Sequence, residues 1–576
     1  MKRLLSLAVM TLLSSAIFAQ SYKVQWGEDM KIKKGSVDME IIHADKDGVY
    51  FVEGKMRMKS YFVIGATYGT SYKLLKFDRN YSLVYEKEFK RELRDHEFHS
   101  IQYMNKNLYL FAYDYKKKEK LFTIYGVKID MATGQGSGEM KELGTFQKDL
   151  KDETFNYAFK PTEDSTRWML VGDISNADHT ALSVTIFDRE LNKKEKSDIK
   201  FGFAKNSFDL EDVILTKDNK YLVVGKEFEF VETGKKKKKK VRTFKKYSIA
   251  KYDKTGSKEM DVQTEVGDKF TLSGKLIAAP DGKILLAGFY ANSVKKDEIG
   301  GVFLNTMDPI TGQVLKTSNE EISSAQLSQG IDDGKDDDDE IKESKKSKQK
   351  AKDDDDEIDF GKSFVIRDVV YNPLNNGFLI ISEVFRYEEY SYVEQNYNST
   401  TKMWDSRWVT VFNYINSDML VVNATAEGQI SRINYIPKYQ VESIRSYSRG
   451  TGISYGMNPN EFFAKGGGMP FYSSFTHMLY KDKLYFVFND NEQNGGVINQ
   501  RERVKTISNF KKSSAFGLEL DLTTGLIKRK SLFSNEDEPI VMPRFGFVSG
   551  NEMFLPAMRM KALGKTEFKM GKITIK

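Results

Sequence analysis

The sequence predicts an all-β fold of eight repeated four-stranded antiparallel units set around a common axis, with seven units as the close alternative. Three observations support this: a turn motif that recurs along the chain, short apolar runs that precede it, and a composition suited to strands. The chain has 30 Tyr and 39 Phe but only 10 Pro, which favours half-buried strands joined by turns.

The recurring turn follows an alternating strand and begins with a short polar residue. Clear copies begin at Asp78, Asp130, Asp188, Asp253, Asp308 and Asp521, and a weaker copy covers Val421–Gly428. An aspartate can accept hydrogen bonds from backbone amides two residues further on, and glycine takes the positive φ that closes a hairpin. The first five copies lie 52 to 65 residues apart, a spacing that fits one four-stranded unit each.

Short apolar runs precede most of these turns and predict strands that are buried on both faces. They are Tyr61–Gly65, Leu108–Ala112, Trp168–Gly172, Tyr221–Gly225, Ile284–Gly288, Phe378–Ser382 and Leu484–Phe488, with an eighth at Met553–Leu555. The last unit continues through Phe568–Ile575 and lacks an outer strand. Tyr22–Lys33 belongs to no other unit, so we expect it to supply that strand and to close the ring.

These units resemble the broad β-propeller superfamily over nearly all of residues 20–576. The resemblance implies one ring-shaped domain, although the Trp-Asp endings of the WD type and the Gly-Gly doublets of the kelch type are missing. Two packed β-sandwich domains are the alternative architecture.

Residues 1–19 have the layout of a secretory signal peptide. Lys2 and Arg3 precede the apolar stretch Leu4–Leu13, and small residues lead to Ala19. The apolar stretch is too short for a transmembrane helix, and no later segment comes close. We therefore expect an exported protein of a Gram-negative envelope: periplasmic, associated with the outer membrane, or extracellular. The absence of cysteine excludes disulfides and thiolate metal sites.

The formal net charge of +7 is small for 576 residues and does not favour a nucleic-acid partner. Residues 318–361 form a charged insertion in which Lys335–Ile341 is repeated as Lys352–Ile358, and we expect it to be disordered. Calcium is the cofactor that the carboxylates of this insertion would suit. Consecutive Asp residues lack the alternating spacing of a calcium loop, so no cofactor is predicted.

A basic run lies between two strands of the fourth unit, at a predicted hairpin tip, and is the candidate anion contact. It comprises Lys235, Lys236, Lys237, Lys238, Lys239 and Lys240. Lipid headgroups, acidic glycans or the Asp-rich insertion would suit it, and a solvated loop is the alternative.

A long connection in the sixth unit is the candidate partner-binding surface. It contains Tyr387, Tyr390, Tyr392, Tyr397, Trp404 and Trp408. Aromatic side chains give flat contact area at low entropic cost, as in protein interfaces and sugar platforms. The alternative is that alternate members pack within an extended hairpin. A further connection, Pro437–Ser474, has glycines at Gly450, Gly452 and Gly466–Gly468 but no phosphate-binding context.

Signals for an enzyme are few. The chain has five histidines, and the nearest pair, His96 and His99, would point to opposite faces of a strand unless the backbone turns. The sequence therefore favours a non-enzymatic binding or scaffold protein that recognises a protein or glycan of the envelope. The alternative is a propeller hydrolase or lyase acting on glycans or peptides, whose carboxylate pair would come from different units.

Overall fold

The computed structural model describes residues 22–28, 30–31, 36–61, 65–147, 154–162, 166–175, 180–201, 207–233, 239–262, 270–278, 283–292, 299–308, 310–311, 313–322, 330–331, 363–398, 402–448, 470–499, 502–560 and 566–576. Within this part, strands dominate and no helix is long and apolar enough to cross a membrane. The chain divides into two compact units. Unit 1 comprises Met1–Glu86, Phe471–Gly496 and Asn509–Lys576, and unit 2 comprises Lys87–Pro470 and Val497–Ser508.

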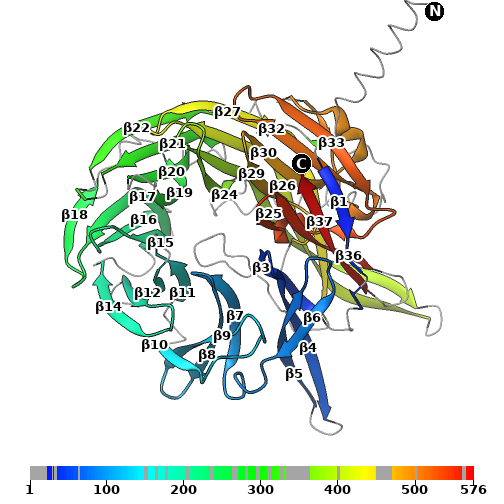
Figure 1. Cartoon of the computed structure of the whole chain (residues 1–576), viewed down its shortest axis with the longest axis horizontal. Coiled ribbons are helices and arrows are strands. Elements are labelled where there is room, and N and C mark those ends of the chain that lie inside the picture. The colour runs from blue at the N-terminus through cyan, green and yellow to red at the C-terminus, as the bar shows by residue number, and fades with distance from the viewer. Residues whose placement is uncertain are drawn as a thin grey trace, which may run out of the picture. The chain divides into compact units, whose positions relative to one another are not determined.

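Unit 2 contains five antiparallel sheets, each formed by strands consecutive in sequence (Figure 1). The first two are β7 (Glu97–Met104), β8 (Asn107–Lys116), β9 (Leu121–Ile129) and β10 (Lys141–Gln147), then β11 (Thr154–Pro161), β12 (Trp168–Ser175), β13 (Thr180–Phe187) and β14 (Lys193–Lys200). The next two are β15 (Phe208–Leu215), β16 (Tyr221–Thr233), β17 (Lys239–Tyr252) and β18 (Lys258–Val262), then β19 (Phe270–Ala278), β20 (Ile284–Ala291), β21 (Ile299–Met307) and β22 (Val314–Glu321). The fifth comprises β24 (Ser363–Asn372), β25 (Gly377–Asn398), β26 (Met403–Ala424), β27 (Ile430–Ile436) and β28 (Gln440–Ser448). A short parallel pair joins β23 (Gly330–Ile331) to β31 (Val504–Lys505).

Unit 1 contains three further sheets. One comprises β3 (Ser36–Asp45), β4 (Gly48–Tyr61), β5 (Gly65–Phe77) and β6 (Leu83–Glu88), and another β29 (Phe475–Tyr480), β30 (Lys483–Asp490), β32 (Ser514–Asp521) and β33 (Ile527–Ser534). The third comprises β34 (Ile540–Val541), β35 (Phe547–Ser549), β36 (Glu552–Met560), β37 (Thr566–Ile575), β1 (Tyr22–Trp26) and β2 (Met30–Lys31). The described connections of unit 1 contain three short 3₁₀ helices, η3 (Glu492–Gly496), η4 (Phe510–Lys512) and η5 (Pro543–Phe545).

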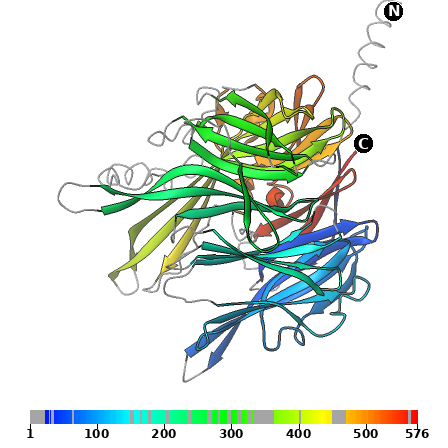
Figure 2. The ribbon, with the colours of Figure 1, turned by 90° about the vertical axis from the view of Figure 1, so that its left-hand side faces the viewer.

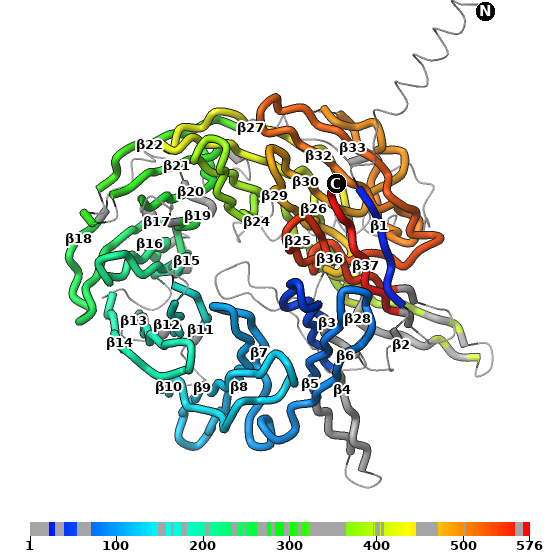
Figure 3. The backbone as a smooth tube through the Cα atoms, in the orientation of Figure 1, coloured from blue at the N-terminus to red at the C-terminus, as the bar shows by residue number. Residues whose placement is uncertain are grey.

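The two ends of the described chain share one sheet. The N-terminal strand β1 pairs antiparallel with β37, from Tyr22 opposite Ile575 to Trp26 opposite Gly571, and the two run side by side in Figure 3. This confirms that the N-terminal segment supplies the outer strand that the last unit lacks.

The predicted polar turns join the third and fourth strands of their sheets. In the turn between β32 and β33, Asp521 Oδ1 accepts from the amides of Thr523 (3.0 Å) and Thr524 (2.7 Å), and Gly525 has a φ of 78°. The weaker copy keeps the geometry with a hydroxyl, because Thr425 Oγ1 accepts from the amide of Gln429 and Gly428 has a φ of 79°. The turn motif is therefore confirmed as a local feature that reverses the chain after the third strand of the sheets that contain it.

The second strands are buried on both faces, as their apolar runs predict. In β16, Tyr221 and Val223 pack against the β11–β14 sheet, while Leu222 and Val224 pack against the β19–β22 sheet. Alternation along β20 follows the same rule, because Leu285 and Leu286 belong to the cores on opposite sides of their sheet. Successive side chains point to opposite faces of a strand, so an unbroken apolar run fills two separate cores.

The sheets of unit 2 therefore pack face to face in sequence order, each inner sheet having a neighbour on both faces. A pair of two-sheet sandwiches would leave one face of every sheet outside a core, so this stacking excludes that architecture for unit 2. In unit 1, the sheet that contains β36 likewise packs on both of its faces, with Leu555 in one core and Phe554 in the other.

The predicted run Tyr61–Gly65 is described only at its two ends, because Tyr61 ends β4, Gly65 begins β5 and the residues between them lie outside the described residues. A buried run of this sheet is Val49–Val52, directly after the Asp45–Gly48 turn.

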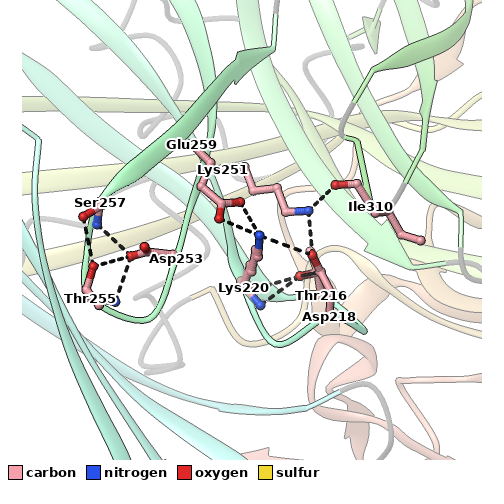
Figure 4. Close-up of polar contacts among 9 residues, drawn as sticks. All are labelled: Thr216, Asp218, Lys220, Lys251, Asp253, Thr255, Ser257, Glu259 and Ile310. Carbon is pink, nitrogen blue, oxygen red and sulfur yellow. Dashed lines mark hydrogen bonds and ion pairs between the residues drawn. The ribbon is translucent and has the colours of Figure 1, made fainter.

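Polar clamps join neighbouring sheets of unit 2 beside these turns (Figure 4). Lys251, two residues before Asp253, has a buried side chain whose ammonium donates to Asp218 Oδ2 (2.9 Å) and to the carbonyl of Ile310 in the next sheet. The equivalent residue of the β19–β22 sheet is Thr306, which donates to the carbonyl of Glu427 in the following sheet at 3.2 Å. These contacts fix each sheet against the turn of its neighbour.

We predict that Asp521→Ala destabilises the protein by about 1 kcal/mol, because two turn amides lose their acceptor. Asp521→Asn keeps the Oδ1 acceptor and is expected to behave like the wild type. The midpoint of urea unfolding measures both, and equal losses in the two variants would show that the turn bonds are not the cause.

Candidate binding surface

The longest hairpin of the described chain is formed by β25 and β26, each of 22 residues. The beginning of β25 and the end of β26 lie in the packed sheet, between β24 and β27, and the rest of the hairpin extends away from it (Figure 2). The extending part is a three-stranded sheet, because β28 pairs with β26 from Asn416 to Trp408. The candidate connection is thus an extended hairpin rather than a loop.

A β-bulge marks the point where the hairpin leaves the packed sheet. Glu383 lies opposite Met419 and Phe385 opposite Asn416, so Ser417 and Asp418 of β26 face the single residue Val384 of β25. Bulges bend a strand and increase its twist. The pairing partner of β26 also changes here, from β27, which ends at Ile436, to β28, which begins at Gln440.

A buried ionic cluster fills this junction. The ammonium of Lys438, which is fully buried, donates to Glu383 Oε1 at 2.6 Å and to Gln440 Oε1 at 2.9 Å. Arg367 on β24 donates to the other oxygen, Glu383 Oε2, through Nε at 2.9 Å and a terminal nitrogen at 2.7 Å. One buried carboxylate therefore joins β24, β25 and the β27–β28 connection, which holds the base of the hairpin in one geometry.

Sequence reasoning missed this cluster. The available signal was Glu383 itself, a charge that directly follows the apolar run Phe378–Ser382. A carboxylate in a strand buried on both faces requires a partner. The sequence does not predict which residue that partner is, because Lys438 lies 55 residues away in the chain.

Three of the six predicted aromatics are exposed near the tip and lie on one face of the hairpin. Tyr397 is opposite Trp404, and Val393 is opposite Trp408, so all four side chains share that face. Their exposed fractions are 54% for Tyr397, 67% for Trp404, 58% for Trp408 and 45% for Val393. We call these four residues the aromatic face.

The other three aromatics are half-buried and make contacts within the hairpin. Tyr387 packs on Tyr414 with ring centroids 5.4 Å apart and donates to Glu389 Oε2 at 2.7 Å. Burial, together with the hydrogen bond to Glu389, raises the pKa of Tyr387. Tyr390 and Tyr392 stack on each other with centroids 6.3 Å apart. The packing interpretation therefore holds for these three residues, and the three exposed ones stay the predicted partner-binding residues.

The basic run Lys235–Lys240 is described only at its end, where Lys239 and Lys240 begin β17. β16 and β17 pair up to Thr233 opposite Lys239, and the run's other four residues are Lys235–Lys238. Those four lysines lie outside the described residues, as do the signal segment 1–19, the glycines of Pro437–Ser474 and most of the charged insertion. Of that insertion, Ser318–Glu321 belong to β22 and Gly330–Ile331 form β23.

The two neighbouring histidines contact different partners, and His99 is the bulged residue between Phe98 and Ser100. His96 Nδ1 is 2.8 Å from Asp114 Oδ2, and its ring lies on Tyr125. His99 packs against Tyr157 of the next sheet, and burial lowers its pKa to about 4. In the described part of the chain, no three His, Asp or Glu side chains are grouped to hold a metal ion.

A carboxyl group of unit 2, that of Asp173, has a strongly raised pKa. Burial raises the pKa of Asp173 on β12 to about 7, and the nearby carboxylate of Asp209 on β15 adds to the effect. Asp209 is itself paired with Arg242 at 2.7 Å. The two carboxyl groups come from neighbouring sheets, an arrangement that sequence spacing does not reveal.

No family model matches the chain, and no curated protein matches it. Among solved structures it is similar to a protein of unknown function from Bacteroides caccae, with 10% identity over 63% of this chain and 89% of that chain, and a TM-score of 0.26. It is also similar to prolyl oligopeptidase B from Galerina marginata, with 8% identity over 84% of this chain and 56% of that chain, and a TM-score of 0.29. The β-propeller domain of the Trilobed protease from Pyrococcus furiosus has 11% identity over 66% of this chain and 94% of that chain, and a TM-score of 0.22. Likenesses this distant carry no argument about activity.

We predict that Glu383→Gln lowers the free energy of unfolding by about 3–5 kcal/mol, because it leaves a buried ammonium and a guanidinium without their counter-charge. Amide hydrogen exchange should show the loss of protection concentrated in β26 and β28. Glu388→Gln, on the same strand, breaks only a partly exposed pair with Arg386 and should change stability by less than about 1 kcal/mol. Equal effects of the two variants would contradict the proposed role of the cluster.

Proposed function

We propose that this chain is an exported, non-enzymatic binding protein of the cell envelope, which recognises a protein or glycan partner through the aromatic face. We further propose that its eight sheets close into a single β-propeller, with β1 and β37 sharing the last blade. Support for the ring comes from the face-to-face packing of consecutive sheets within each unit and from the pairing of the two chain ends.

The aromatic face is the observation that carries the proposal. Large apolar side chains are normally buried, and here four of them are exposed together on one face of a projecting hairpin. Trp404 and Trp408 are separated by about 13 Å along β26, as four residues of a strand require. Tryptophan and tyrosine are the residues that most often dominate binding energy at interfaces.

Rigidity at the base of the hairpin strengthens this interpretation. The ionic cluster at Glu383 and the pairing with β28 fix the hairpin before any partner arrives. A preorganised surface loses less conformational entropy on binding than a loop would. Export rests on the signal layout of residues 1–19, which places the partner in the envelope.

We predict that Trp404→Ala combined with Trp408→Ala weakens partner binding at least thirtyfold, because each ring is a candidate hot spot worth about 2 kcal/mol. Affinity capture from the native envelope measures this, with capture by immobilised envelope glycans as a second arm. The control variant removes two exposed aliphatic side chains elsewhere, Ile310→Ala with Leu526→Ala, and should capture like the wild type. Equal recovery of every partner by the tryptophan variant would overturn the proposal.

The carboxyl pair of Asp173 and Asp209 favours a second candidate, a hydrolase or lyase acting on glycans or peptides. A carboxylic acid with a pKa of about 7 is partly protonated at neutral pH, as a general acid must be. Asp209 could then act as the paired carboxylate.

Asp173→Asn tests this candidate. If the pair is catalytic, the substitution abolishes turnover of a panel of glycans and peptides, and no turnover by the wild type would refute the idea. The raised pKa also predicts that the wild type loses stability as the pH rises from about 4 to 7, because its folded state holds a proton that the unfolded state has released. Asp173→Asn should remove that slope, as urea midpoints across this range would show.

A further inference from the structure

Aromatic and polar side chains alternate along the aromatic face. Tyr397 and Trp404 lie near the tip, with ring centroids 5.3 Å apart and ring planes inclined at 59°. Two residues earlier on β25, and therefore on the same face, is the exposed side chain of Gln395. Two residues earlier again, Val393 lies opposite Trp408. A polar row thus separates the two aromatic positions.

The polar groups of this face are mostly neutral. Ser391 lies opposite Thr410 with their hydroxyl oxygens 2.9 Å apart, and Gln395 carries an amide that both donates and accepts. Among the described side chains that β25 and β26 present on this face beyond the bulge, the one charged group is the carboxylate of Glu389. It accepts the hydrogen bond of Tyr387. Such a set of donors and acceptors suits a ligand rich in hydroxyl groups, and the carboxylate disfavours a polyanion.

The aromatic face is a narrow strip. β28 pairs with β26 no farther toward the tip than Trp408, so from there the described hairpin is two strands wide. Neighbouring strands lie about 5 Å apart. A standard protein interface buries about 800 Å² on each partner and takes roughly 20–30 residues. A strip of two strands is too small for such an interface by itself, and its shape fits one extended chain.

We infer that the aromatic face binds a linear, neutral glycan chain, an inference that rests on the proposed function and chooses the glycan from its two classes of partner. The CH-rich faces of pyranose rings stack on tryptophan and tyrosine, while their hydroxyl groups bond to amide and hydroxyl side chains. Trp404 and Trp408 are about 13 Å apart along β26, which exceeds the length of one sugar ring. The chain must therefore extend over several sugar units to lie on both rings.

Affinity electrophoresis of the full chain, in gels that contain a soluble polysaccharide, tests the inference. The neutral panel comprises hydroxyethylcellulose, mixed-linkage β-glucan, glucomannan and amylose, and alginate is the polyanion. We expect at least one neutral polysaccharide to retard the chain. Trp404→Ala combined with Trp408→Ala should abolish this retardation. Any retardation by alginate should be the same in this variant as in the wild type, because lysines elsewhere on the chain would cause it.

A chain-length series tests whether both rings are used. For oligosaccharides of the retarding glycan, calorimetric titration should show affinity rising roughly tenfold from the disaccharide to the hexasaccharide. Trp404→Ala and Trp408→Ala should each remove most of that rise. Gln395→Ala should weaken hexasaccharide binding about fivefold through the loss of one hydrogen bond. The control Leu374→Ala shortens an exposed side chain in the β24–β25 turn and should bind like the wild type.

Failure of the glycan assignment and failure of the proposed function give different results. No retardation by any neutral polysaccharide, or unchanged retardation of the tryptophan double variant, overturns the assignment. So does retardation by alginate that is lost in that variant. If glycan binding is absent while the wild type captures an envelope protein that the double variant does not, the proposed function stands and the partner is a protein. Equal capture by both, without glycan binding, overturns both.

Discussion

Burial of single strands between two cores is the constraint on which this structure depends. Because the second strand of an inner sheet of unit 2 contributes alternate side chains to the cores on its two sides, such a sheet is complete only with both neighbours. The protein has no cysteine and therefore no disulfide, so packing and the polar clamps beside the turns hold the sheets together. Stability then resides in a series of interfaces between sheets, and each interface is of ordinary size.

Elements that leave this stack are free to bind. The connection between second and third strands is short in most sheets of unit 2, but two hairpins extend well beyond the packed cores. In β25–β26, a buried carboxylate holds the base, and the aromatic face lies farther along the strands. In β16–β17, Arg242 donates to Asp209 on the neighbouring strand β15.

The half of the aromatic set that packs internally shows why composition alone does not define a binding surface. Tyr387 and Trp408 both belong to an aromatic-rich segment, and both lie on strands of the same hairpin. Register places Tyr387 opposite Tyr414 near the base, where its ring is covered, and places Trp408 opposite Val393 near the tip, where it is not. The local sequence is aromatic-rich at both positions, and the distance from the packed sheet determines whether the ring is covered or exposed.

The sequence by itself determined the strands, most of their boundaries and the turns, because a period of two and the chemistry of Asp and Gly act over a few residues. It also determined that the first strand completes the last unit. Only the tertiary structure decided which core each face enters, which aromatics are exposed, and that Lys438 and Arg367 meet on Glu383. Those outcomes depend on a bulge and on partners dozens of residues apart, and no local pattern encodes them.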